Sequence, residues 1–254
     1  MDNRIGAQLY TLRDFCQNEE DFDKSMKKVS EMGYKTIQAS AIGPMSGETV
    51  KEICDKYGLE VVCTHRPFAN YENKLDDEVA YHKAMNCEIA GLGCMPFEYI
   101  ENEMTRESLT ELIGRMNKVS DELAKHGITF AYHNHAFEFE KFDGKYIMDY
   151  FLEEGNFSFI FDVYWLTYSG IDPVDFITKM GKRAICIHFK DIEADKETMT
   201  EVGQGITDWD AVIKACAESG AKYALVEQDT CQRDPFESMQ MSYDYLSQKE
   251  FFKV

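Results

Sequence analysis

The segment HGITFAYHNHAF, residues 126–137, contains in order the three signals that decide the fold. Gly127 follows an amphipathic stretch, as glycine commonly does just past the end of a helix. The run ITFAY is rich in residues that favour strands, and polar side chains follow it directly. The same arrangement recurs where Gly33 precedes YKTIQAS, Gly58 precedes LEVVCTH and Gly220 precedes AKYALVEQ. We therefore expect four helix-to-strand junctions spaced through the chain.

The stretches that precede such junctions have the hydrophobic period of helices. One apolar stripe consists of Phe22, Met26, Val29 and Met32, which lie three or four residues apart. A longer stripe follows Thr105, which has the residue type of a helix N-cap. That stripe consists of Leu109, Leu112, Met116, Val119 and Leu123. Both stretches are predicted to be helices with one buried face.

Short apolar runs between the helices predict the strands. They lie near residues 4–9, 35–40, 59–64, 88–94, 128–133, 158–162, 184–189 and 223–227. Their spacing of roughly 25 to 40 residues fits repeated strand–helix units with right-handed crossovers. We predict an α/β fold, a (β/α)8 TIM barrel that forms a single domain over residues 1–254. The alternative is a doubly wound open sheet, but QLYTLRD after the first strand lacks the glycine-rich phosphate fingerprint of that fold.

The composition restricts the classes of partner. Lys and Arg number 27 against 46 Asp and Glu, a formal net charge of -19, and no basic patch is visible, so we expect no nucleic-acid partner. No apolar run approaches the ~20 residues of a membrane helix, so we expect no membrane partner. The N-terminus MDNRIGAQLY has no secretion-signal pattern, and the 8 cysteines occur without a C-x-x-C pair. We expect reduced thiols in a cytoplasmic protein.

Polar residues gather at the expected carboxyl ends of the strands, where TIM barrels carry their chemistry. They are Gln8, Tyr10, His65, Arg66, His133, Asn134, His135, Glu138, Asp162, His188, Lys190, Asp191, Glu227, Gln228 and Asp229. Four of the 6 histidines are in this set, whereas His82 and His126 fall in helical stretches and are expected at the surface. Imidazoles and carboxylates at one rim predict a site for Mn, Zn, Co or Fe rather than Mg or Ca.

A divalent ion at such a site can hold a ketone oxygen and a neighbouring hydroxyl, which polarises the carbonyl and acidifies the adjacent C–H bond. A carboxylate or imidazole beside that carbon then acts as the base. The sequence contains no G-x-S-x-G, P-loop or H-E-x-x-H motif that would indicate another chemistry.

The phrases YHNHAFEFE, FDVYW, IHFKD, EVGQGITDW and VEQD, in this order, resemble the sugar phosphate isomerase/epimerase family, the xylose-isomerase-like TIM barrels of the AP endonuclease 2 superfamily. The resemblance runs from IGAQLYTLRD to DPFESMQMSYDYL. It implies one divalent metal ion, manganese above all, with zinc, cobalt or iron as alternatives. It also implies that two acidic residues, an Asp and a His hold the ion. By motif, Asp162, His188 and Glu227 match three of these ligands.

The fourth ligand departs from the family pattern. Ketose epimerases carry a glutamate where this chain has His133, and the nearest carboxylate is Glu138, which is therefore expected as the ligand. His133 or His135 is then free to act as the catalytic base. Trp165 stands where many relatives carry a histidine. The His-x-His pattern resembles inosose dehydratase and C-glycoside-cleaving enzymes, which remove a proton next to a ketone and expel a group from the β-carbon.

The remaining site residues are expected to contact the substrate. Lys190 is expected to stabilise the enediolate oxygen, with an ion pair to Asp191 as the alternative. His65 would hydrogen-bond a substrate hydroxyl or support the metal ligands. The loop residue Gln204 would contact the sugar.

Two aromatic residues complete the expected substrate-binding set. Tyr10 and Trp165 would pack against the apolar face of the sugar. Ordinary packing within the fold is the alternative role for both residues.

Several functions remain open at this point. The first is a metal-dependent isomerase/epimerase that acts on a sugar or keto sugar through an enediolate, with a dehydratase or lyase sharing its first step. The second is an inactive relative that serves as a binding subunit. An abasic-site endonuclease would need more His and acidic ligands and a surface that tolerates DNA, which the charge of -19 disfavours. The substrate is expected to be an unphosphorylated sugar or cyclitol, because no phosphate site is identifiable, and a homo-oligomer is expected.

Overall fold

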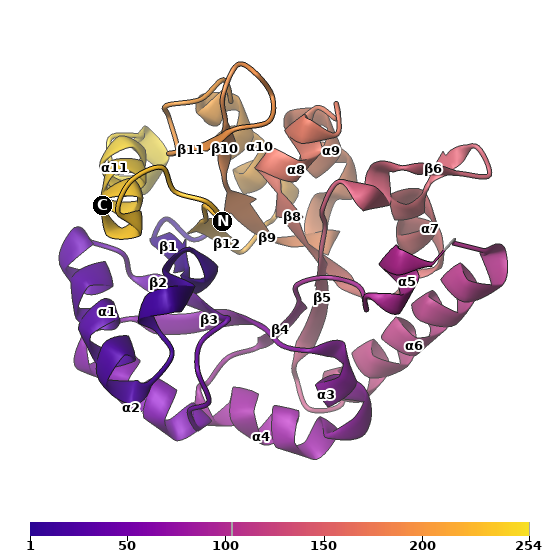
Figure 1. The fold of residues 1–254 in the computed structure, drawn as a ribbon, viewed down its shortest axis with the longest axis horizontal. Helices are drawn as coiled ribbons and strands as arrows, with labels where there is room; N and C mark the ends of the chain where they lie inside the picture. Colours follow the sequence, from indigo (N-terminus) through magenta and orange to yellow (C-terminus); the bar gives the residue numbers. More distant parts are fainter. Residues whose placement is uncertain (103, 254) are drawn as a thin grey trace.

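The computed structural model describes residues 1–102 and 104–253, and it contains a closed barrel of parallel strands surrounded by helices (Figure 1). The strands follow one another around the barrel in the order β1-β12-β9-β8-β5-β4-β3-β2. Parallel pairing of β1 with β12 closes the barrel and excludes the open doubly wound sheet. The predicted TIM barrel is confirmed. Its strands are β1 (Ile5–Gln8), β2 (Thr36–Ser40), β3 (Glu60–His65), β4 (Ile89–Leu92), β5 (Thr129–His133), β8 (Ser158–Asp162), β9 (Ala184–Phe189) and β12 (Tyr223–Val226).

The helices lie outside the barrel, in the segments between successive strands and after the last strand (Figure 1). They are α1 (Glu19–Met32), α2 (Gly47–Lys56), α3 (Phe68–Asn73), α4 (Leu75–Ala84), α5 (Glu98–Glu101), α6 (Arg106–Ala124), α7 (Ile147–Glu154), α8 (Val163–Tyr168), α9 (Pro173–Met180), α10 (Trp209–Ser219) and α11 (Pro235–Leu246). Short 3-10 helices are η1 (Leu9–Phe15), η2 (Phe137–Phe139), η3 (Gly181–Arg183) and η4 (Glu250–Phe252). Two small antiparallel pairs join β6 (Lys141–Phe142) to β7 (Lys145–Tyr146) and β10 (Asp191–Ile192) to β11 (Met199–Thr200).

The two predicted amphipathic helices are present with the expected buried faces. Every residue of the apolar stripe in α6 is buried, and the side chain of Thr105 accepts a hydrogen bond from the backbone N–H of Ser108 at its start. Gly33 and Gly220 end α1 and α10 with φ angles of 112° and 90°. This left-handed conformation is strained for residues with a Cβ atom, which explains why glycine punctuates the junctions.

Side chains inside the barrel form an apolar layer with a polar layer above it. The apolar layer is a cluster of Val62, Cys63, Ile89, Ala131, Ile160, Ile185, Cys186 and Leu225. For five members of this cluster the residue two positions further along the chain is a histidine or a carboxylate; the pairs are Cys63 and His65, Ala131 and His133, Ile160 and Asp162, Cys186 and His188, and Leu225 and Glu227. Because side chains alternate between the two faces of a strand, residues two apart point the same way. The polar members therefore lie together above the apolar layer.

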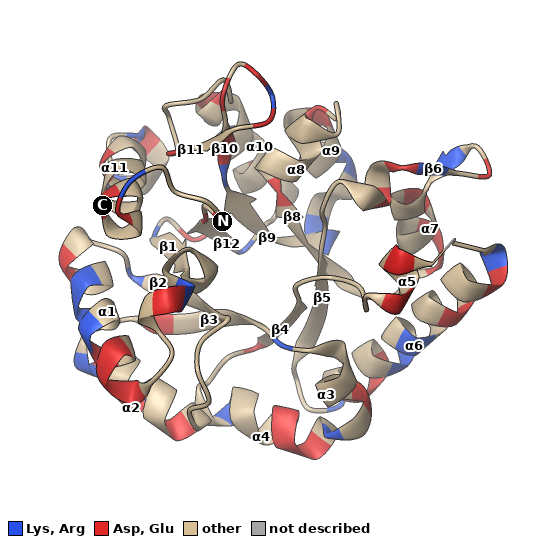
Figure 2. Cartoon of the chain, in the orientation of Figure 1, with Lys and Arg blue, Asp and Glu red and all other residues tan. Residues whose placement is uncertain are grey.

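Charged side chains of both signs are interspersed over the outer helices (Figure 2). All 8 cysteines are free, and Cys94 and Cys231 are the two that are partly exposed. Within the described residues, no helix combines the length and the apolar character needed to cross a membrane.

The connection between β9 and α10 is fixed by one buried carboxylate. Asp191 accepts hydrogen bonds from the backbone N–H groups of Gly203, Gly205 and Thr207 at 2.9, 3.2 and 3.3 Å. It also accepts one from Trp209 Nε1 at 2.7 Å. These donors belong to residues distant along the loop, so the carboxylate determines the path of the loop beside the barrel mouth.

We predict that Asp191→Asn destabilises the protein by about 3 kcal/mol or more, because an amide presents N–H groups to some of these buried donors. Denaturant unfolding of the metal-free protein measures the change. Asp210→Asn is the control: its side chain is 78% exposed and pairs with Lys249 at 3.0 Å, so the change should stay within about 0.5 kcal/mol. Equal effects of the two substitutions would contradict the anchoring role of Asp191.

Candidate metal centre

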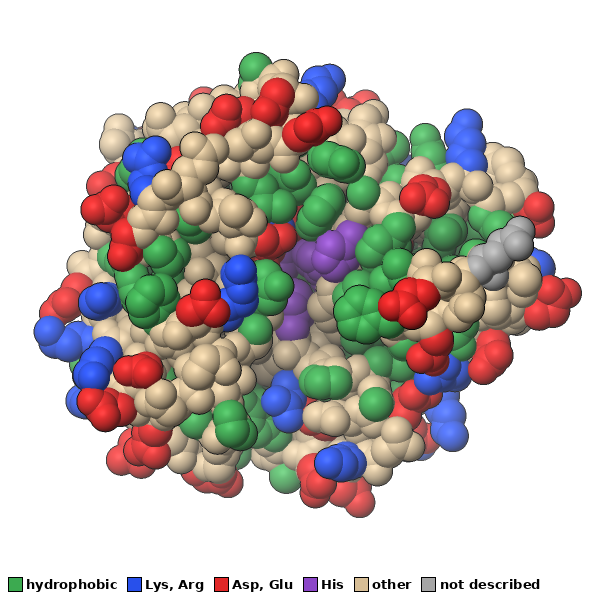
Figure 3. All heavy atoms as spheres, viewed as in Figure 1, with side chains coloured by type: hydrophobic (Ala, Val, Ile, Leu, Met, Phe, Trp, Pro, Cys, Tyr) green, Lys and Arg blue, Asp and Glu red, His purple; other side chains and the backbone are tan. Residues whose placement is uncertain are grey.

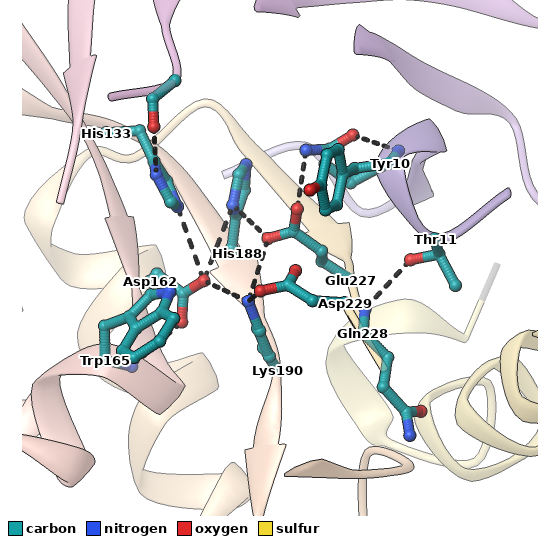
Figure 4. A network of polar contacts seen from close by, with 12 residues as sticks. Tyr10, Thr11, His133, Asp162, Trp165, His188, Lys190, Glu227, Gln228 and Asp229 are labelled. Atoms are coloured by element: carbon teal, nitrogen blue, oxygen red, sulfur yellow. Dashed lines mark hydrogen bonds and ion pairs between the residues drawn. The ribbon is translucent and has the colours of Figure 1, made fainter. Parts of the chain in front are cut away.

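Four side chains meet at the carboxyl ends of the barrel strands (Figure 4). His133 ends β5, Asp162 ends β8, His188 lies one residue before the end of β9, and Glu227 directly follows β12. One nitrogen or oxygen atom from each residue lies within 4.8 Å of the others, and all four residues are buried. The structure thus brings together three of the four expected metal ligands, with His133 as the fourth member.

The atoms that face one another in this group lack hydrogen-bond partners. They are His133 Nε2, Asp162 Oδ2, His188 Nδ1 and Glu227 Oε2. Asp162 Oδ2 lies 3.4 Å from His133 Nε2 and 3.8 Å from His188 Nδ1. Buried polar atoms are nearly always paired, and ligands bound at about 2.0–2.2 Å to one divalent ion lie at comparable distances from each other. The four residues therefore fit a divalent metal ion with nitrogen and oxygen ligands.

The outer nitrogen of each imidazole is fixed by an acceptor. His133 Nδ1 lies 3.1 Å from the carbonyl oxygen of Gly93, and His188 Nε2 lies 2.7 Å from Gln38 Oε1. Gln38 Nε2 in turn donates to the carbonyl of Thr64 at 3.3 Å, which sets the orientation of its amide. Because a carbonyl oxygen only accepts, each outer nitrogen carries a proton, and in the neutral imidazole the inner nitrogen carries the lone pair. Both rings are thus oriented so that their neutral forms present a lone pair to a metal ion.

The outer oxygens of the two carboxylates are fixed in the same way. Glu227 Oε1 accepts from Gln8 Nε2 at 2.7 Å, and Gln8 Oε1 accepts from the backbone N–H of Tyr10 at 2.8 Å. Asp162 Oδ1 accepts from the backbone N–H of Trp165 at 3.1 Å, as the N-cap of α8. One oxygen of each carboxylate is therefore held by the protein and the other faces the centre.

A buried ammonium group lies beside the centre. Lys190 is 1% exposed, and its Nζ lies 2.7 Å from Asp229, 3.4 Å from Asp162 and 3.7 Å from Glu227. Burial lowers the pKa of Lys190, but the three carboxylates outweigh burial and hold the pKa above its usual range. Lys190 is therefore charged. The alternative partner expected from the sequence, Asp191, is engaged with the loop after β9 instead.

The same charges act on His188. Burial lowers its pKa, whereas Glu227 and Asp162 raise it, to about 9. In the metal-free protein a proton therefore sits on Nδ1, 2.8 Å from Glu227 Oε2. A cation at the centre would replace this proton between the two carboxylates.

Glu138, expected as the fourth ligand, is not among the four residues of the group. It lies in η2, beyond the end of β5, and its buried carboxylate accepts hydrogen bonds from Tyr132 Oη and from the backbone N–H of His135. Burial raises the pKa of Glu138 to about 7, although these hydrogen bonds act in the opposite direction and lower it. The carboxylate thus anchors the turn that carries His135. His133 takes the place in the group because it lies within the strand, on the same face as Ala131.

His135 lies over the centre without belonging to it. Its ring stacks on Phe137 with centroids 5.3 Å apart and lies 4.8 Å from the ring of His133, and its buried Nδ1 has no hydrogen-bond partner. Burial, together with His133 and Lys190, lowers the pKa of His135 to about 3, so the imidazole is neutral at pH 7. Trp165 packs near it, with ring centroids 5.4 Å apart.

A cavity of about 760 Å³ opens above these residues. The histidines lie at the bottom of the hollow in Figure 3. The expected site residues that line it are Tyr10, His65, His133, His135, Lys190 and Glu227. Gln204 and Trp165 are absent from the described residues that line the cavity: Gln204 is exposed on the loop before α10, and Trp165 packs beside His135 and Lys190. His65 Nε2 is buried without a hydrogen-bond partner, and its ring lies 5.2 Å from that of His133.

Sequence reasoning missed the residues that orient the ligands. It gave no role to Gln38, Gln8 or the carbonyl of Gly93, and it named Asp229 at a strand end without connecting it to Lys190. The available signal was a glutamine inside each of two apolar strands, since a buried amide needs a specific partner.

One histidine was placed wrongly. His82 was expected at the surface but is fully buried; its Nε2 lies 2.8 Å from Thr64 Oγ1 and its Nδ1 lies 2.7 Å from the carbonyl oxygen of Glu78. The side chain faces Thr64 of β3 and the ring of Tyr71, whose centroid lies 6.4 Å from that of His82, and these contacts make it a structural residue.

Known proteins resemble this chain over nearly its whole length. The rhizopine catabolism protein MocC of Rhizobium meliloti is 21% identical, over 89% of this chain and 80% of that protein. The inosose dehydratase of Clostridium beijerinckii is 22% identical, over 92% of this chain and 91% of that protein. Among solved structures, a sugar phosphate isomerase/epimerase from Parabacteroides distasonis superposes with a TM-score of 0.85 at 20% identity, covering 100% of this chain and 96% of that one.

The family assignment rests on a separate match. Residues 26–247, which include all four residues of the candidate metal centre, match the sequence profile of the xylose isomerase-like TIM barrels. The closed barrel and its superposition on the Parabacteroides distasonis structure agree with that profile. This chain therefore belongs to the xylose isomerase-like TIM barrel family.

Proposed function

We propose that this protein is a divalent-metal-dependent enzyme that removes the proton next to the carbonyl group of a sugar, keto sugar or cyclitol, and returns it as an isomerase or epimerase. The observation that carries the proposal is the convergence of four unpartnered buried ligand atoms at the floor of a cavity, beside a charged lysine. Manganese is the proposed ion, with zinc, cobalt or iron as alternatives. A cytoplasmic location and a homo-oligomer remain predictions.

His133, Asp162, His188 and Glu227 would hold the ion, which supplies Lewis acidity to a substrate carbonyl. The Lys190 ammonium group is the donor nearest to the centre and would stabilise negative charge on the oxygen of the enediolate.

We assign the proton transfer in this arrangement to His135. His133 was the other candidate from the sequence, but its Nδ1 proton is held by the Gly93 carbonyl and its Nε2 faces the ligand group. His135 lines the cavity and has a buried Nδ1 without a hydrogen-bond partner, so it is the imidazole placed to accept the proton and return it. His65 and Tyr10 line the same cavity and would bind substrate hydroxyls and the sugar face.

An unphosphorylated substrate fits the charges of the cavity wall. Both arginines that line the cavity are paired with carboxylates: Arg66 with Glu78 at 2.9 Å and Arg115 with Glu72 at 2.7 Å. Recognition of a phosphate group relies on free cationic or amide donors. The paired arginines therefore support a sugar or cyclitol without a phosphate.

A dehydratase or lyase is the second candidate. Elimination from a keto sugar begins with the same proton abstraction and differs only in the departure of a group from the β-carbon. The observation that favours it is the similarity to inosose dehydratase over 92% of this chain, together with the His-x-His pattern of His133 and His135.

The test is incubation of the Mn²⁺-loaded protein in D₂O with a panel of ketoses and inososes, followed by NMR and mass spectrometry. We expect deuterium at the carbon next to the carbonyl; exchange with isomerised product supports the isomerase, and loss of water supports the dehydratase. His135→Ala should slow exchange by about 100-fold or more while metal content is unchanged. Absence of exchange from a protein that binds metal and sugar would favour the inactive binding subunit.

The identity of the fourth ligand is tested by two substitutions on neighbouring positions. We predict that His133→Ala weakens Mn²⁺ affinity by more than about 100-fold, because it removes a ligand, whereas Glu138→Gln changes it by less than about tenfold. Metal content by plasma mass spectrometry and Mn²⁺ titration measure both. Loss of metal from Glu138→Gln alone would restore Glu138 as the ligand.

Metal affinity should also depend on pH. Since His188 has a pKa of about 9 in the metal-free protein and must be neutral to bind a metal ion, binding at pH 7 releases close to one proton. Affinity should therefore rise roughly tenfold for each pH unit between about pH 6 and pH 8 and level off above pH 9. Calorimetry in two buffers with different ionisation enthalpies counts the proton. An affinity that is constant over this range would contradict the assignment.

A further inference from the structure

The cavity has two chemically different halves, because different strands contribute to each. The ends of β1, β5, β9 and β12 supply the polar residues around the candidate metal centre. The segments at the ends of β2, β3 and β4, which are neighbours in the barrel, supply mostly apolar residues. We define the apolar half by Ile42, Pro67, Phe68, Met95, Pro96 and Phe97.

The two halves are continuous. His65 ends β3, and its ring lies 5.2 Å from that of His133 and 5.6 Å from that of His188. Pro67 and Phe68 follow it directly in the chain and line the same cavity. A group attached to a ring at the metal centre would therefore extend past His65 into the apolar half.

The charged residues that line the apolar half all form ion pairs, and Arg115 pairs with two carboxylates, Glu72 at 2.7 Å and Glu98 at 3.3 Å. Arg66 is neutralised by the buried Glu78, and Arg115 forms two hydrogen bonds of 2.7 Å to the carboxylate of Glu72. The guanidinium of Arg115 also lies over the ring of Phe68, 5.3 Å from its centroid. An uncharged group suits this environment better than a carboxylate or phosphate, which would have to compete for arginines already paired.

Phe97 is the strongest sign that something covers this half. It is 71% exposed, more than any other large apolar side chain among the described residues. Exposed apolar surface that borders a cavity is typical of binding sites. The volume of about 760 Å³ also lies within the range of about 300–1,000 Å³ of pockets that take drug-sized ligands.

We propose that the apolar half is a subsite for an uncharged, flat apolar substituent, such as an aryl aglycone, carried by the sugar or cyclitol whose ring lies at the metal centre. The proposal rests on the proposed function for the position of that ring. The subsite would bind the substituent between Phe97 and the segment that contains Phe68, and it would take no part in the proton transfer.

The experiment compares two ligands that differ only in the substituent. Calorimetry of the Mn²⁺-loaded protein with phenyl β-D-glucoside and methyl β-D-glucoside should give an affinity about tenfold or more higher for the phenyl compound. Phe97→Ala should reduce this ratio by about threefold or more without changing the affinity for the methyl compound. Tyr168→Ala is the matched control, since Tyr168 is an aromatic side chain of 45% exposure outside the cavity lining, and it should leave the ratio unchanged.

Equal affinities for the two glucosides, no binding of either, or a ratio that Phe97→Ala leaves intact would overturn the proposal. A second copy of the chain is the competing occupant of this surface, and light scattering of the Phe97→Ala variant tests for it. Loss of an oligomer with an unchanged affinity ratio would assign Phe97 to a contact between copies of the chain and would also overturn the subsite. The proposed function fails separately. A phenyl preference without deuterium exchange into any keto sugar would keep the subsite and refute the enzyme, and exchange without a phenyl preference would do the reverse.

Discussion

The alternation of side chains along closed, parallel strands is the constraint on which the candidate site depends. It raises one polar layer directly above an apolar one, so that His133, Asp162, His188 and Glu227 each stand two residues beyond a buried apolar residue of the same strand. Strand register then sets the level of each ligand: Asp162 pairs with His188, whereas His188 pairs with Leu225, so that Glu227 lies two residues further along the chain than the partner of His188. A slip of one residue in any of these strands would turn its ligand away from the centre.

The lone pairs of buried ligands on a rigid barrel must also point toward the centre, and hydrogen bonds from the surrounding residues fix this orientation. Gln38, Gln8 and the Gly93 carbonyl occupy the outer atoms of three ligands and leave the inner atoms without partners. Such a centre lacks positive charge, because two carboxylates face each other in a buried space with Lys190 to one side. A proton on His188 supplies part of the missing positive charge, and a divalent ion supplies more of it.

The sequence was sufficient for the barrel, because each strand is a short run of β-forming residues placed between helices that end in glycine or turn residues. The predicted ranges 158–162 and 184–189 coincide with the observed strands, and the others differ by at most two residues at either end. Asp162, His188 and Glu227 were expected together from their places at strand ends, and the structure brings these three side chains together. Glu138 lies outside the group, because a count of residues cannot show that the chain leaves the strand at His133 and turns. The better signal was that His133 lies two residues after the apolar Ala131, so that both side chains point to the same face of β5.

Other failures have the same origin. Whether His82 is covered depends on how α4 packs against β3 and Tyr71, and whether Gln204 reaches the cavity depends on the path that Asp191 gives to its loop. Both are properties of contacts between distant segments. Local patterns describe which face of an element is buried, but they do not describe how two loops or helices meet.

The segment after β4 serves two purposes within a few residues. The carbonyl of Gly93 holds His133, and a Cβ atom at this position would meet His65 Nδ1 at 2.9 Å, so the position tolerates little beyond glycine. Four residues later, Phe97 projects from the surface with little to constrain it. A lineage built on this barrel could therefore change residues 95–97 and acquire new ligand preferences, while the neighbouring glycine keeps the chemistry intact. Selectivity would be easy to evolve here because tolerance to mutation changes so sharply along one short stretch of chain.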